Sequence, residues 1–263
     1  MRLWNLVTGK KAGVLNFDRN ILTAVGEGRF ASGEGRRVIW DTAGEEFAVG
    51  FERGIVVFNI DSKPKAKIAP APRTKIHQMH YLPSSDEDSS SSYLLVSTED
   101  GRVLVYDTSE TVQPTQPQQQ QQQQQEQKTT KEDTIPASRL VAQIGGPAAG
   151  MTGRIKDFEI IPLSAPATFL VVTGCSDGTV RFWALRTGEL AGKADAGEAK
   201  GFTALQVGTL LGQYSTGTRI TCLKSFAMTG TPDQEEEEEE VVVGKAGEDS
   251  SSEEEEGDDD DSE

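Results

Sequence analysis

One stretch of sequence decides the fold: Phe169-Leu-Val-Val-Thr-Gly-Cys-Ser-Asp-Gly-Thr-Val-Arg-Phe-Trp183. Two runs of strand-forming residues flank a polar turn, and the Asp-Gly pair at its centre suits a tight hairpin because glycine tolerates a positive φ. Residues in the second run alternate between two faces, as they do in a strand. The stretch therefore predicts a β-hairpin that ends on an aromatic residue.

The same pattern occurs three more times towards the N-terminus. The copies are Tyr93–Asp107, Phe47–Asn59 and a headless copy at Arg2–Asn5. The terminal aromatic residues of the four copies lie 54, 48 and 77 residues apart, and they are Trp4, Phe58, Tyr106 and Trp183. Without a low-complexity stretch of about 30 residues the last spacing is about 47, close to a four-stranded propeller blade. We therefore predict an all-β fold, a β-propeller with about three complete blades and partial ones.

The remaining strands of each blade can be placed between these hairpins. We expect inner strands at 37–41, 75–82 and 154–161, outer strands at 65–69, 140–144 and 207–214, and a ring-closing strand at 218–228. Two segments interrupt the pattern, a Ser- and acid-rich loop at 83–92 and a Gln/Pro-rich insertion at about 109–138. Surface loops absorb such insertions at small entropic cost.

Negative charge is concentrated at the C-terminus. From Asp233 to Glu263 there are 18 Asp and Glu against one Lys, while the whole chain has a net charge of −16, so residues 1–232 are nearly neutral. Such a block repels itself and cannot form a core, so we predict a disordered acidic tail at 230–263 after a propeller domain at 1–229. The tail would bind basic proteins, or it would only increase solubility.

The chain shows no secretory signal and no apolar run of about 20 residues that could span a membrane. Cys175 and Cys222 lie in strand-like runs and are interpreted as small buried apolar residues. We expect a reducing nuclear or cytosolic environment and no membrane partner.

The segment ending in Ser176–Trp183 resembles the WD-repeat consensus. By that resemblance Thr173, Asp177 and Trp183 match three of the four residues of the family's hydrogen-bonded network, and the fourth, a histidine, is missing. Trp4 and Asp100 are the corresponding residues of more divergent copies. WD propellers usually have about seven blades, and this chain starts inside a hairpin, so we expect an N-terminal truncation.

Three segments together resemble one narrower family, the PAK-interacting WD-repeat proteins, whose fungal members are maintenance-of-killer assembly factors of the large ribosomal subunit. The segments are Leu3–Gly13, Phe47–Gly54, and Gly208–Tyr214 with Thr218–Leu223. The resemblance implies a nucleolar scaffold for pre-ribosomal proteins and particles in large-subunit assembly and rRNA maturation. The alternative is a negative regulator of a p21-activated-type protein kinase.

Three sequence patterns match motifs of catalytic, cofactor-binding or metal-binding sites. Gly174–Gly178 matches the G-x-S-x-G elbow around Ser176, but a strand rather than a helix is expected to follow. Gly26–Ala31 matches a dinucleotide fingerprint, but glycines at 33 and 35 would break the required helix. His77 and His80 suggest a metal pair, but residues three apart on a strand face opposite sides. We therefore predict no catalytic residue, cofactor, metal or small-molecule substrate.

The densest basic cluster comprises Lys63, Lys65, Lys67, Arg73 and Lys75. It could contact RNA phosphates or act as a nuclear signal. A solvated outer strand and loop is the simpler interpretation, so direct contact with RNA stays open.

Overall fold

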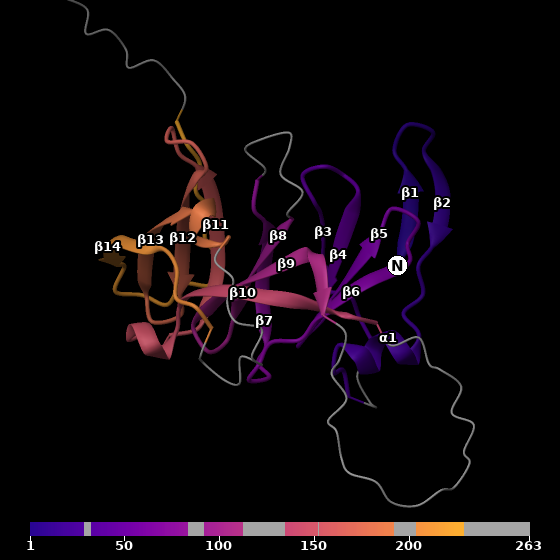
Figure 1. The fold of residues 1–263 in the computed structure, drawn as a ribbon, viewed down its shortest axis with the longest axis horizontal. Coiled ribbons are helices and arrows are strands. Elements are labelled where there is room, and N and C mark those ends of the chain that lie inside the picture. The colour runs from indigo at the N-terminus through magenta and orange to yellow at the C-terminus, as the bar shows by residue number, and fades with distance from the viewer. Residues whose placement is uncertain (29–32, 84–91, 113–134, 152, 192–203, 229–263) are drawn as a thin grey trace, which may run out of the picture. The chain divides into compact units, whose positions relative to one another are not determined.

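The computed structural model describes residues 1–28, 33–83, 92–112, 135–151, 153–191 and 204–228 (Figure 1). Its contacts divide the chain into two units, Met1–Ala227 and Met228–Glu263. Most of the predicted loop at 83–92, most of the Gln/Pro-rich insertion and the acidic tail lie outside the described residues.

The fold is all-β and consists of successive four-stranded antiparallel sheets, the blades of a β-propeller. The first blade is β3 (Arg37–Trp40), β4 (Glu46–Gly50), β5 (Ile55–Asn59) and β6 (Pro64–Ile68). The second is β7 (Ile76–Tyr81), β8 (Tyr93–Thr98), β9 (Arg102–Val112) and β10 (Ala137–Gly145). The third is β11 (Ile155–Pro162), β12 (Thr168–Cys175), β13 (Thr179–Arg186) and β14 (Thr209–Ser215).

Shorter elements accompany the blades. A hairpin of β1 (Arg2–Asn5) and β2 (Lys10–Val14) precedes the first blade, and two 3-10 turns lie at Pro147–Ala149 and Thr187–Glu189. Lys67 of β6 pairs in parallel with Ala137 of β10, which joins the first two blades into one eight-stranded sheet. Among the described residues, no helix is long and apolar enough to cross a membrane.

The aromatic residues that define the repeat occupy one register position in all three blades. Phe58 lies opposite Phe47, Tyr106 opposite Leu94, and Trp183 opposite Val171. The predicted inner and outer strands also agree with the structure within a few residues, apart from the predicted strand at 218–228. The periodic hairpins therefore predict the blades correctly.

Apolar side chains pack between successive blades. Val57 and Leu104 belong to one core cluster between the first and second blades, and Leu95 and Phe158 belong to another between the second and third. These side chains are fully buried. Packing of this kind buries both faces of the first and second blades and one face of the third, so hydrophobic burial contributes much of the contact between blades.

A short helix, α1 (Arg19–Ala24), was not predicted and packs on the first blade. The Asp18 carboxylate caps it by accepting a 2.8 Å hydrogen bond from the Ile21 amide. Ile21 is buried in a cluster with Phe47 and Phe58. The helix is only six residues long, so its three apolar residues give no clear helical period in the sequence.

Two turn glycines allow the next segment of chain to approach closely. Gly101 and Gly178 have φ values of +85° and +86°. A Cβ at Gly101 would lie 2.7 Å from the Gly153 carbonyl oxygen, and one at Gly178 would lie 2.6 Å from the Thr218 carbonyl oxygen. Only glycine satisfies both the positive φ and the close contact.

The prediction of a strand at 218–228 is wrong, because the structure assigns no strand there. The segment is held by other contacts. The Leu223 amide donates to the Asp157 carboxylate at 3.1 Å, and Ile220 and Leu223 lie over Gly174. Cys222 in this segment is exposed rather than buried, while Cys175 is buried as expected, and both thiols are free.

Candidate functional site

The predicted WD-type residues of the third blade form a partial network. The Trp183 indole donates to the Thr173 hydroxyl at 3.3 Å, which links β13 to β12 inside the core. Asp177 stays within its own turn, where its carboxylate accepts from the Thr179 amide at 2.9 Å and lies 3.6 Å from the Arg181 guanidinium. The structure therefore connects two of these three predicted residues and leaves Asp177 apart from them.

The second blade stabilises the equivalent turn with a buried ion pair. The guanidinium of Arg102 is fully buried and binds the Asp100 carboxylate through Nε at 3.0 Å and through a terminal nitrogen at 2.6 Å. Thr98 also donates to Asp100, at 2.5 Å, and Arg102 donates to the Ala71 carbonyl. Sequence reasoning named Asp100 but missed Arg102. Trp4, the remaining predicted residue, lies on β1 with 56% of its surface exposed.

A second buried polar cluster joins the first two blades. The Glu46 carboxylate accepts from the Tyr81 hydroxyl at 3.0 Å and from the Thr108 hydroxyl at 2.6 Å, and it pairs with Lys65 at 2.6 Å. Burial, together with the Glu46 carboxylate, raises the pKa of Tyr81. Every group in this cluster has a partner, so it fixes the packing of the blades and offers no free acid or base.

Ser176 lies in a hairpin turn, as its sequence context indicated. Its hydroxyl accepts a hydrogen bond from the Arg154 amide at 3.2 Å, and the strand β13 follows at Thr179. A nucleophile elbow requires a helix after the serine. Gly26 and Gly28 come after α1 rather than at the start of a helix, and the end of that motif lies outside the described residues. The Ser176 turn therefore lacks the helix that its motif requires, and the described glycines of the second motif follow a helix instead of beginning one.

The two histidines lie on β7 in different surroundings. His77 is half-buried, and its Nε2 lies 3.3 Å from the Lys156 ammonium. His80 packs edge-on against the Phe158 ring, and its buried Nε2 has no hydrogen-bond partner among the described residues. Burial is the main cause that lowers the pKa of each imidazole.

His80 lies close to two carboxylates of the next blade, Asp157 and Glu159, with one potential ligand atom of each within 4.8 Å of the others. Both carboxylates already have hydrogen-bond or ion-pair partners in the chain. Asp157 accepts hydrogen bonds from Gln78, Phe158 and Leu223, and Glu159 pairs with Lys224. A cation at this place would have to displace Lys224, so the cluster is a weak candidate for a metal site. Sequence analysis did not find this cluster, because His80 lies on the second blade and both carboxylates lie on the third.

A group of cations collects where the inner strands β3, β7 and β11 begin. We call this group the basic rim, and it comprises Arg36, Arg37, Lys75, Arg154, Lys156 and Arg219. Contacts connect it across blades: Arg37 Nε donates to the His77 carbonyl at 2.7 Å, and Lys156 reaches the His77 imidazole. Arg154, Arg219 and Lys75 are all close enough to contribute to lowering the pKa of Lys156, of which burial is the main cause.

The register of the blades explains why these cations gather. Arg37, Gln78 and Asp157 are equivalent, because they lie opposite Gly50, Ser97 and Gly174 in the three blades. The preceding residues are Arg36, His77 and Lys156. In the second and third blades the register of strand pairing shifts at His77 and at Lys156. Such a shift breaks the regular alternation of side chains between the two faces of the sheet. One basic or titratable side chain is thus presented at the same position of three successive blades.

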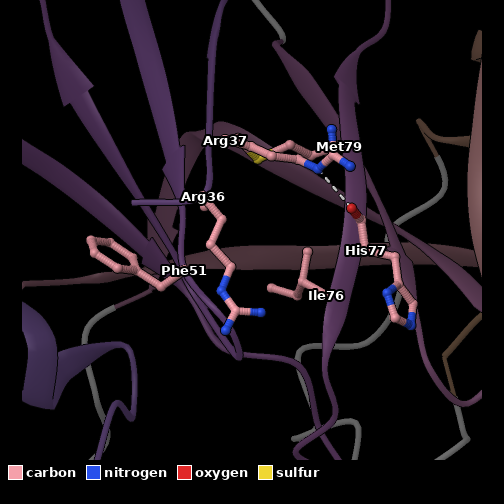
Figure 2. A pocket seen from close by; sticks show the side chains of 7 residues that line it. Arg36, Arg37, Phe51, Ile76, His77 and Met79 are labelled. Atoms are coloured by element: carbon pink, nitrogen blue, oxygen red, sulfur yellow. Dashed lines mark hydrogen bonds between the residues drawn. The ribbon is translucent and has the colours of Figure 1, made fainter. Parts of the chain in front are cut away.

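A cavity of about 310 Å³ opens at the basic rim between the first and second blades. Its floor is apolar and consists of Phe51, Ile76 and Met79, all of which are buried. Figure 2 shows these lining residues, with Arg36 between Phe51 and Ile76 and with the bond from Arg37 to the His77 carbonyl. The cavity therefore combines an apolar base with cationic walls.

Three residues of the basic cluster predicted from the sequence have separate partners within the chain. Lys65 pairs with the buried Glu46, Arg73 donates to the Gly26 carbonyl, and Lys75 pairs with Glu52 at 2.9 Å. Only Lys75 belongs to the basic rim. The rim itself was missed because its members are scattered over the sequence and meet only when the blades stack.

No protein-family description and no curated protein matches the sequence. Solved structures do match, over part of their length. The WD40 domain of SCAP from fission yeast is 13% identical, with a TM-score of 0.36 over 57% of this chain and 28% of that one. Saccharomyces cerevisiae Sqt1 is 10% identical, with a TM-score of 0.43 over 69% and 39% of the two chains. BBS1N in complex with ARL6DN is 17% identical, with a TM-score of 0.35 over 56% and 36%.

The chain thus spans well under half the length of these structures. Identities and TM-scores this low assign neither a family nor a partner to it. The narrower resemblance to the PAK-interacting proteins finds no support among these matches.

Proposed function

We propose that this protein is a non-catalytic scaffold that binds other macromolecules through its blade ends. The observation that carries the proposal is the basic rim, where one basic or titratable side chain occupies the same position of three successive blades beside a cavity with apolar and cationic lining residues. Two further observations support it. The Ser176 turn lacks the helix that its chemistry requires, and the buried carboxylates of Glu46 and Asp157 are engaged in packing.

We further propose that the scaffold acts in assembly of the large ribosomal subunit, in the nucleolus. The sequence resemblance to the PAK-interacting and maintenance-of-killer proteins supports this assignment. The charge distribution also suits it, because a basic rim and an acidic tail on one chain can attract partners of opposite charge in a ribonucleoprotein particle.

Affinity purification of the tagged full-length chain, with quantitative mass spectrometry, tests the assignment. Pre-ribosomal proteins and nucleolar factors should be enriched over a tag-only control, together with precursor rRNA. A variant with Arg37→Glu and Lys156→Glu should lose part of this set, while Lys10→Glu with Lys11→Glu on β2 should keep it. Enrichment of a p21-activated-type kinase without ribosomal factors would overturn the assignment in favour of kinase regulation.

A further inference from the structure

The basic rim carries more positive charge than its own surroundings neutralise. Six cations are accompanied by two carboxylates, Glu52 and Glu99, which pair with Arg36, Lys75 and Arg154. Within the described part of the chain, no carboxylate lies within salt-bridge distance of Arg37, Lys156 or Arg219. Like charges held together on a fold oppose its stability. A surplus of this kind is therefore expected where an anionic ligand compensates it.

Two cations of the basic rim contact His77. The Lys156 ammonium approaches the His77 imidazole at 3.3 Å while Arg37 donates to the carbonyl of the same residue. Burial and then the charge of Lys156 lower the pKa of His77, which favours its neutral form. A bound anion at this place would gain contacts with Arg37 and Lys156 at once, without first displacing a carboxylate of the chain.

The cavity beside these cations indicates what else the ligand carries. Its floor of Phe51, Ile76 and Met79 offers no hydrogen-bonding side chain, and Gly50 keeps it open, since a Cβ there would lie 3.2 Å from the Met79 sulfur. At about 310 Å³ it lies at the small end of ligand pockets, which suits one apolar side chain rather than a whole ligand. The ligand should therefore combine negative charge with one apolar group.

These features favour a peptide over a nucleic acid. Proteins that hold single strands stack the bases on exposed aromatic rings, whereas the only aromatic ring that lines this cavity, apart from the His77 imidazole, is Phe51, which is 2% exposed. A duplex would meet the cations with phosphates and leave the apolar floor empty. An acidic peptide uses both parts of the surface.

We propose that the basic rim binds an acidic peptide segment of a partner protein, with one apolar side chain in the cavity beneath Arg36 and Arg37 and carboxylates against Arg37, Lys156 and Arg219. This inference rests on the proposed binding role and adds the chemistry of one partner. It does not depend on the ribosomal assignment, because the surface is the same whichever assembly the protein joins.

Fluorescence anisotropy with the purified full-length chain tests the proposal. The probes are a fluorescein-labelled glutamate-rich peptide with one central leucine, the same peptide with alanine in place of leucine, and an oligouridylate of the same net charge. We expect the leucine peptide to bind about tenfold more tightly than the alanine peptide, a difference within the range for burying one aliphatic side chain. We expect the oligouridylate to bind more weakly than either peptide.

Charge-reversal variants assign the site. Lys156→Glu with Arg219→Glu should weaken the leucine peptide by at least about tenfold, while Lys10→Glu with Lys11→Glu, the same change in charge on exposed residues of β2, should stay within about twofold. Gly50→Ala should abolish the preference for leucine over alanine, because its Cβ enters the cavity. Every variant keeps residues 230–263, so all of them carry the same acidic tail.

Three results would each overturn the proposal. They are no saturable binding of the leucine peptide at physiological ionic strength, an equal loss of affinity in the β2 variant, and tighter binding of the oligouridylate than of the leucine peptide. If the charge-reversed rim variant does not fold by near-ultraviolet circular dichroism, Lys156→Gln with Arg219→Gln replaces it. A failed purification of pre-ribosomal particles would leave this assay unaffected, so the two proposals fail separately.

Discussion

The second and third blades share one hairpin register but stabilise its turn in different ways. In the second, Asp100 holds the fully buried Arg102 through two hydrogen bonds. In the third, Asp177 faces the surface, and the stabilising polar contact lies deeper, between Trp183 and Thr173. The aspartates occupy equivalent positions before Gly101 and Gly178, yet only one of them supports a buried charge.

This difference shows that the repeat determines the backbone and leaves the polar contacts to each blade. Strand pairing and the turn glycine are common to both hairpins. The third blade uses an indole and a hydroxyl, whereas Tyr106 and Val96 occupy the corresponding positions of the second. A residue that matches a repeat consensus therefore has no fixed energetic value until its neighbours are known.

Removal of Asp100 should have the largest effect on stability. In Asp100→Ala the Arg102 guanidinium stays buried without its carboxylate, which costs about 3 kcal/mol or more. Chemical denaturation followed by intrinsic fluorescence measures the free energy of unfolding. The matched change Asp177→Ala should cost less than about 1 kcal/mol, because that ion pair is long and partly exposed. Equal losses in the two variants would contradict the contrast between the turns.

The Trp183–Thr173 contact should contribute a smaller amount. Thr173→Val leaves the buried indole nitrogen unpaired and should lower the free energy of unfolding by about 1–2 kcal/mol. A double-mutant cycle with Trp183→Phe isolates the hydrogen bond from the change in packing. We expect a coupling energy of about 1 kcal/mol. In the second blade Val96 already lies at the position of Thr173, so a coupling near zero would mean that both blades do without this bond.

The blades could be predicted from the sequence because their signal is local. Turn glycines, alternating apolar residues and terminal aromatics all lie within about 15 residues of one another. Helix α1 and the segment at 218–228 were misjudged because their structure depends on distant partners. Ile21 packs on the first blade, and Leu223 is held by Asp157 instead of by a ladder of hydrogen bonds.

The candidate site could not be predicted for the same reason. Arg36, His77 and Lys156 have no common sequence motif, and only the stacking of three blades brings them to one rim. Arg102 was missed because arginine side chains are usually exposed. The sequence does not show that Asp100 pairs with a buried Arg102 guanidinium. Conversely, Lys65 belongs to the cluster of basic residues in the sequence, but in the structure it pairs with the buried Glu46.

The second and third blades also differ in where their histidines lie. Both histidines of the chain, His77 and His80, lie on β7, and the equivalent residues of β11 are Lys156 and Glu159. Burial is the main cause that lowers the pKa of each imidazole from its ordinary value of 6.5. His77 faces Lys156, Arg154, Arg37 and Glu99, and His80 faces Glu159, Lys224, Asp157 and Arg37.

The smallest expected effect is therefore a loss of stability on mild acidification that originates in the second blade. Just below pH 6.5 the unfolded chain binds protons that the folded chain does not, so the free energy of unfolding decreases as the pH falls through the window between 6.5 and the lowered pKa values. Denaturation curves between about pH 7.5 and 5.5 should show this decrease in the natural chain and a nearly flat profile in His77→Gln with His80→Gln. Hydrogen exchange locates the effect: amides of β7 and β8 should lose protection before those of β11 and β12. A slope that persists without either histidine, or earlier loss in the third blade, would contradict the assignment, because acidic side chains titrate mainly below this window.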